Sequence, residues 1–176
     1  DERRESARER LILAHEVWGW SPHRGQERLL RCPAQIRVAA CGRRWGKTEA
    51  LSVDVATLAL AEARAGRECR QLIIAPTDSQ ARILGDLVLR RIYTAFDQCS
   101  HWTDGLAWEM HRMPALRIAL RREAERASSK SNAPLAGPVS EICCRTAGRD
   151  GGSLRGLWAH RIVVDEASRV PDTVMA

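Results

Sequence analysis

Residues 41–48 combine glycine, lysine and threonine at a spacing that suits phosphate binding. The segment is Cys-Gly-Arg-Arg-Trp-Gly-Lys-Thr. A triphosphate needs inward-pointing backbone N–H groups, the N-terminal end of a helix, and a cation that reaches its β and γ phosphates. The usual pattern is G-x-x-x-x-G-K-[ST], and here Cys41 occupies its first position, with Gly42 one place later. A small residue can still make this turn. We therefore predict a nucleotide-binding loop.

Lysine is rare in this chain, which makes Lys47 informative. Of the 28 basic residues, 26 are arginine and only Lys47 and Lys130 are lysine. A compact ammonium on a flexible stem is the group that a phosphate-binding loop requires. The abundance of arginine indicates a coding bias, so two interpretations of Arg43 and Arg44 remain open. They contact phosphate or a neighbouring acid, or they are merely exposed loop residues.

A second segment, residues 161–166, is apolar and ends in two acids. Its sequence, Arg-Ile-Val-Val-Asp-Glu, predicts a short strand that ends at Asp165 and Glu166. An acid at such a position can hold magnesium together with Thr48. The adjacent acid can polarise the attacking water as a general base. By itself, the segment would also fit an ordinary strand followed by a helix-capping aspartate. Together with residues 41–48, it predicts an ATPase that requires Mg²⁺.

These segments need a scaffold that places the loop beside the acids. Apolar periodicity predicts helices over 3–19 and 49–65, the latter ended by Gly66, and a helix after Thr77 that buries Ala81, Leu84, Val88, Ile92 and Ala95. Strands are predicted at 36–40, 72–75, 116–120, 141–146 and 161–164, with loops over 123–139 and 148–156. The β-α-β-α order predicts an α/β fold with a mostly parallel central sheet flanked by helices.

Composition limits the other possibilities. A chain of 176 residues is long enough for one core, and its net charge of +6 permits nucleic-acid contact without requiring it. The sequence contains no run of ~20 apolar residues, and its first residues lack the apolar stretch of a signal peptide. Six cysteines occur without zinc-finger spacing. We expect a reduced, intracellular protein without transition-metal chemistry or membrane contact.

Residues 42–48 and 161–168 resemble the Walker A and Walker B motifs of the large terminase subunit of tailed bacteriophages. Pro22 and Gln26 resemble that family's adenine-recognising Q motif, and residues 153–156, Ser-Leu-Arg-Gly, resemble its S-x-R-G segment. The similarity extends from about residue 18 to residue 170. The individual motifs are common, but their order and spacing together are specific to this family.

The resemblance implies a P-loop NTPase of the RecA-like, ASCE type that uses ATP and Mg²⁺. It implies that the nucleotide is bound by Gln26 and by the loop residues Gly42, Arg43, Arg44, Trp45, Gly46, Lys47 and Thr48. Thr48 and Asp165 would bind the metal, and Lys47, Glu166 and the arginine finger Arg155 would act in catalysis. The implied partners are double-stranded DNA, the portal protein, the small terminase subunit and further copies in a ring, expected to be a pentamer. The implied location is the host cytoplasm, and transiently the portal vertex of the procapsid.

The same resemblance predicts the domain organisation. Residues 1–35 would be a helical, adenine-binding lead-in, and residues 36–176 a P-loop core that is truncated after Walker B, without the family's nuclease domain. Two alternatives remain. Residues 75–77 and 165–168 also resemble motifs of SF2-type helicases and translocases. The second alternative is an oligomerisation module that binds a nucleotide without hydrolysing it. Such a module, however, has no need of Glu166.

Overall fold

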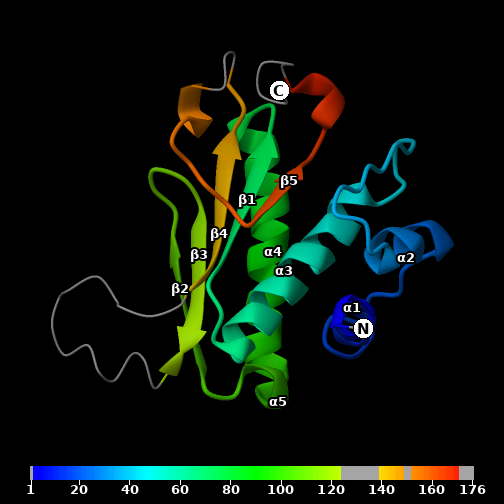
Figure 1. Cartoon of the computed structure of the whole chain (residues 1–176), viewed down its shortest axis with the longest axis vertical. Helices are drawn as coiled ribbons and strands as arrows, with labels where there is room; N and C mark the ends of the chain where they lie inside the picture. Colours follow the sequence, from blue (N-terminus) through cyan, green and yellow to red (C-terminus); the bar gives the residue numbers. More distant parts are fainter. Residues whose placement is uncertain (1, 124–138, 149–151, 171–176) are drawn as a thin grey trace, which may run out of the picture.

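A five-stranded sheet with helices against it forms the centre of the computed structural model, which describes residues 2–123, 139–148 and 152–170 (Figure 1). The α-helices are α1 (Glu2–Glu16), α2 (Arg24–Arg31), α3 (Lys47–Ala65), α4 (Asp78–Gln98) and α5 (Ser100–Thr103). The strands are β1 (Cys69–Ala75), β2 (Leu106–His111), β3 (Arg117–Arg122), β4 (Ser140–Thr146) and β5 (Arg161–Val164). Two 3₁₀ turns, η1 (Gly152–Leu154) and η2 (Ala167–Arg169), flank β5 in the sequence.

The strands are arranged in the order β2-β3-β4-β1-β5. β1 pairs in parallel with β4 on one side and with β5 on the other. β2 and β3 form an antiparallel hairpin, and β3 also runs antiparallel to β4. The predicted α/β class is confirmed, with a parallel part made of three strands and an antiparallel pair at one edge.

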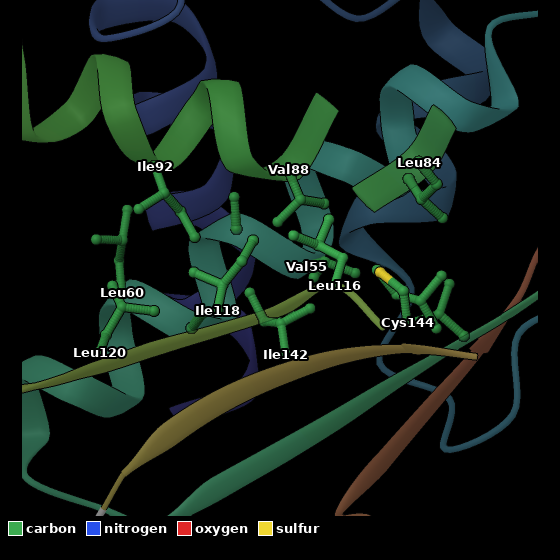
Figure 2. Close-up of a cluster of buried hydrophobic side chains, with 14 of the residues drawn as sticks. Val55, Leu60, Leu84, Val88, Ile92, Leu116, Ile118, Leu120, Ile142 and Cys144 are labelled. Carbon is green, nitrogen blue, oxygen red and sulfur yellow. The ribbon is translucent and has the colours of Figure 1, made fainter. Parts of the chain in front are cut away.

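Helices α3 and α4 bury the main core against one face of the sheet. Figure 2 shows Val55 and Leu60 from α3, and Leu84, Val88 and Ile92 from α4, gathered above β3 and β4. A smaller cluster on the opposite face contains Leu72, Ile74 and Cys143. Successive strand residues alternate between the two faces, which is why Cys143 and the adjacent Cys144 belong to different clusters.

The helix boundaries follow local sequence. Thr77 caps α4 by accepting a hydrogen bond from the backbone N–H of Gln80, as predicted. Gly66 ends α3 in the left-handed conformation, with φ of 64°. The predicted apolar face of α4 is confirmed, because all five of its residues are buried.

The prediction of a strand at residues 36–40 is wrong. This segment has no regular secondary structure, and the side chains of Ile36 and Val38 are 83% and 86% exposed. β-branched residues favour a strand only where a neighbouring strand completes the hydrogen bonds. Among the described residues, no strand pairs with this segment, and β5 pairs with β1 alone.

Other sequence expectations need smaller corrections. Apolar residues alternate with arginines along β3, a pattern typical of a half-exposed strand, but Arg121 is buried and pairs with Glu109 of the neighbouring β2. Helix α2 lies within the helical lead-in predicted at residues 1–35 but was not predicted as a separate helix, and β2 was not predicted. Most of the loop predicted at 123–139 and part of the loop at 148–156 lie outside the described residues. Within the described part of the chain, no helix has the length and apolarity that crossing a membrane requires.

Candidate active site

The candidate site lies where the N-terminal end of α3 meets the carboxyl end of β5 (Figure 1). Ligands of open α/β sheets bind outside the carboxyl ends of the parallel strands. Helix α3 begins at Lys47, and β5 ends one residue before Asp165. The two segments singled out from the sequence therefore meet at the edge where this class of fold places its chemistry.

Thr48 and Asp165 are joined by a direct contact. The Thr48 hydroxyl donates a hydrogen bond of 3.3 Å to Oδ2 of Asp165, across 117 residues of sequence. The other oxygen, Oδ1, accepts the backbone N–H of Glu166 at 3.0 Å. Asp165 is buried, so its carboxylate is held from both sides.

Glu166 has an unusual backbone conformation. Its φ of 54° lies in the left-handed region, which is uncommon for a residue with a long side chain. Its side chain is exposed, and it makes no hydrogen bond or ion pair with the described residues. Strained conformations of this kind cluster at functional sites. The carboxylate of Glu166 therefore remains available to a ligand beside the fixed carboxylate of Asp165.

The loop before α3 bends sharply. Gly46 is the residue before the helix and has φ of 82°, and Arg44 has φ of 61°. Lys47 is half-buried, and within the described parts of the chain its ammonium has no hydrogen bond or ion pair. A cation next to the N–H groups of a helix start is well placed for phosphate.

Gln26 holds this loop from α2. Its side-chain nitrogen donates to the carbonyl oxygens of Trp45 and Gly46 at 3.2 and 3.1 Å. Its side-chain oxygen accepts the backbone N–H of His23 at 3.0 Å. The structure thus gives Gln26 a role that the sequence did not reveal, because it ties the start of α2 to the loop. A contact of Gln26 with adenine stays a prediction.

His23 also supports the loop, and sequence reasoning overlooked it. Its Nδ1 accepts from the backbone of Gly25 and Gln26, which caps α2, and its Nε2 lies 3.0 Å from the Trp45 carbonyl oxygen. The His23 and Trp45 rings meet edge to face, with centroids 4.8 Å apart. His23 and Gln26 have the spacing of a capping box, and this pattern in the sequence could have indicated the start of α2.

The first turn of α3 is anchored to α4 as well. Arg91 donates from Nη2 to Glu49 at 2.6 Å and from Nε to the Ser52 hydroxyl at 2.7 Å. Burial lowers the pKa of Arg91, and the charge of Glu49 offsets part of that effect. This contact fixes the helix directly after Thr48.

The oxygen atoms at this site suit a hard divalent cation. Mg²⁺ takes few protein ligands, usually one or two oxygen groups, and completes its shell with water and phosphate. The Thr48 hydroxyl and the Asp165 carboxylate already touch, so both lie within reach of one such ion. The residues therefore fit magnesium.

The remaining predicted residues surround this centre less closely. Gly42, Arg43 and Arg44 are exposed on the loop. Arg155 is exposed directly after η1, which packs against β4. Among the described residues, no hydrogen bond or ion pair joins Arg155 to the loop or to Glu166.

Comparison with known proteins reveals relatives over most of the chain. No family model matches the sequence. The chain is 31% identical over 166 residues to the large terminase subunit of Thermus virus P23-45, and 31% identical over 161 residues to that of Thermus phage G20c. In both cases the match covers 90% of this chain.

Solved structures agree with the sequence comparison. The large terminase ATPase domain of Thermus phage P74-26 superimposes with a TM-score of 0.69, and a mutant of that domain with 0.70, at 27% identity and over 91% of this chain. The chain is related to the large terminase ATPase domain. It therefore has the RecA-like P-loop fold that this domain has, and the resemblance first seen in its motifs is confirmed.

The match covers only part of those terminases. The chain spans 30% of the length of the two curated terminases and 59% of the solved ATPase domain. The helicase alternative is not favoured, since both the sequence relatives and the structural relatives are large terminases.

Proposed function

We propose that this chain binds Mg-ATP between the α3 loop and the end of β5 and hydrolyses it. The observation that carries the proposal is the hydrogen bond between Thr48 and Asp165, with Lys47 and Glu166 as their neighbours in the chain. These four residues bring an ammonium, a hydroxyl and two carboxylates to one edge of the sheet. Phosphoryl transfer depends mainly on positioning and on compensation of charge, and these are the groups it requires.

Each residue has a separate part in the proposed reaction. Lys47 and the backbone of residues 42–48 hold the phosphates, and Thr48 and Asp165 hold the metal, which neutralises charge on the β and γ phosphates when bound. Glu166 accepts a proton from water as the water oxygen forms its bond to the γ phosphorus. The bond from that phosphorus to the bridging oxygen breaks, and ADP and phosphate leave. Gln26 is proposed to contact adenine through its side-chain oxygen, which retains a second lone pair.

Hydrolysis at this site would drive the movement of double-stranded DNA into a procapsid. The proposal rests on the relationship to large terminase subunits. The proposed partners are DNA, the portal protein, the small terminase subunit and neighbouring copies in a ring, with Arg155 acting on the site of a neighbour. The proposed location is the host cytoplasm and, during packaging, the portal vertex.

Calorimetric titration with ATP and Mg²⁺ tests the nucleotide site directly. The wild-type chain should bind, and Lys47→Ala should lose nearly all affinity because the ammonium that compensates the phosphate charge is gone. Arg90→Ala, which removes an exposed cation on α4, is the matched control and should bind like wild type. Equal affinity of the Lys47→Ala variant and the wild type would rule out the assignment.

A further inference from the structure

Three arginines converge on Asp54, a buried residue of α3 about two turns after Thr48. The Asp54 side chain is 3% exposed. Arg10 donates to its Oδ1 at 2.8 Å and Arg37 to its Oδ2 at 2.6 Å. Arg161 also donates to Oδ2. One carboxylate thus binds three cations.

The three arginines come from separate parts of the chain. Arg10 belongs to α1, Arg37 to the segment that enters the phosphate-binding loop, and Arg161 is the first residue of β5. Arg161 reaches further, to the backbone carbonyl of Asp54 at 3.3 Å and to Gln71 of β1 at 3.4 Å. Asp54 therefore connects the helix that leaves the loop with the strand that leads to Asp165.

The charges explain why Asp54 stays ionised at this depth. Burial alone would raise the pKa of Asp54, but attraction to Arg161, Arg10 and Arg37 outweighs it, so the pKa is held below its ordinary value. Removal of one arginine leaves the carboxylate with two cations. Each arginine can therefore be tested separately without leaving a buried charge unpaired.

We infer that Asp54, acting through Arg161, is a positioning residue that sets the contact between Thr48 and Asp165; the inference rests on the proposed function. The contact between Asp54 and Arg161 and the contact between Thr48 and Asp165 close a ring through α3 and β5. Asp54 and Thr48 share α3, while Arg161 begins the four-residue β5 and Asp165 directly follows its last residue. If the contact between Asp54 and Arg161 loosens, β5 can slide relative to α3, and the two magnesium ligands separate. Arg10 binds the same carboxylate from outside this ring.

The test compares Arg161→Gln with Arg10→Gln, two variants that each remove one cation from Asp54. Mg²⁺ affinity is measured by calorimetry in the presence of ADP, and ADP affinity is measured separately in EDTA. Arg161→Gln should weaken Mg²⁺ binding about tenfold, as loss of a supporting partner does at metal sites, with little change of ADP binding in EDTA. Arg10→Gln should retain wild-type Mg²⁺ affinity. Equal affinity of the two variants for Mg²⁺ would overturn the inference.

A second readout needs neither metal nor nucleotide. The amide of Glu166 is bonded to Asp165, so its hydrogen exchange reports whether that carboxylate stays in place. Exchange should accelerate in Arg161→Gln and not in Arg10→Gln, and unchanged exchange in both variants would also overturn the inference. If the wild-type chain bound no Mg-nucleotide, the proposed function would fail while this measurement still tested the positioning. Should Arg161→Gln not fold, Arg161→Lys keeps the charge but loses the planar fork, and should show the same direction of effect.

Discussion

The side-chain nitrogen of Gln26 lies 3.1 Å from the carbonyl oxygen of Gly46, so a residue of α2 holds the loop that starts α3. Glycine is required on the other side of this contact. A Cβ added at Gly46 would lie 2.5 Å from that nitrogen, and φ at this position is 82°. The short helix before the loop and the loop itself therefore behave as one unit.

Replacement of Gln26 by alanine separates its two proposed roles. The loss of its hydrogen bonds to the loop should lower affinity for ATP and for GTP alike, because both nucleotides use the same phosphate contacts. A contact with adenine should add a further loss for ATP only. Fluorescence titrations with both nucleotides measure the two losses. If they are equal, Gln26 supports the loop and does not recognise the base.

Glu166→Gln should separate binding from hydrolysis. The amide keeps the shape of the side chain but cannot accept a proton from water, so ATP affinity should persist while turnover falls at least about a hundredfold. Single-turnover hydrolysis in the assembled terminase is the measurement. Glu68→Gln, which changes an exposed acid just before β1, is the matched control and should hydrolyse ATP normally. Normal turnover by Glu166→Gln would require another base.

Arg155 should act on a neighbouring subunit. Its exposed position after η1, with no hydrogen bond or ion pair to the phosphate-binding loop or to Glu166 among the described residues, motivates this expectation. Mixed rings of Arg155→Ala and Glu166→Gln subunits should then recover part of the ATPase activity, because some interfaces combine an intact arginine with an intact base. Full activity of rings made only of Arg155→Ala would contradict the trans role. A dilute monomer as active as the ring would transfer the role to Arg43 or Arg44.

Gly85 of α4 should tolerate no side chain. An added Cβ would lie 2.6 Å from Leu116 and 2.7 Å from Cys144 in the main core. Helix propensity favours alanine by about 1 kcal/mol, but overpacking costs about 1–3 kcal/mol, so Gly85→Ala should destabilise the fold. Urea unfolding measures the difference. The double variant with Leu116→Val, which removes the clashing methyl group, should recover part of the loss.

Asp54 predicts a pH dependence of stability. Its folded pKa is depressed, so it stabilises the fold above its unfolded pKa, near 3.8, and that contribution is lost as pH falls through the lower folded pKa. Asp54→Asn should cost about 3–5 kcal/mol at neutral pH, because three arginines lose their anion. The difference from wild type should shrink below pH 3.8. Asp97→Asn, an exposed change on α4, should follow the wild-type curve.

The sequence predicted the parts of the fold that depend on neighbouring residues. The start of α4 at Thr77, the end of α3 at Gly66 and the acids after β5 all follow from local patterns. The failed strand at residues 36–40 depends instead on a pairing partner, which local sequence does not specify. The three arginines around Asp54 lie 17 to 107 residues away from it in the chain. Side-chain clusters of this kind become visible only when the topology is known.

The outer edge of β5 affects how the chain behaves in solution. Within the described residues this edge has no partner strand, and Ile162 of β5 is 58% exposed. Outside the sheet, Ile36 and Val38 are exposed even more. Such an edge invites pairing between molecules, whereas the net charge of +6 keeps them apart. Salt screens that repulsion, because the Debye length shrinks to about 3 Å at 1 M. The chain produced alone should therefore store best when dilute and at low ionic strength, and should form strand-rich aggregates as salt is raised.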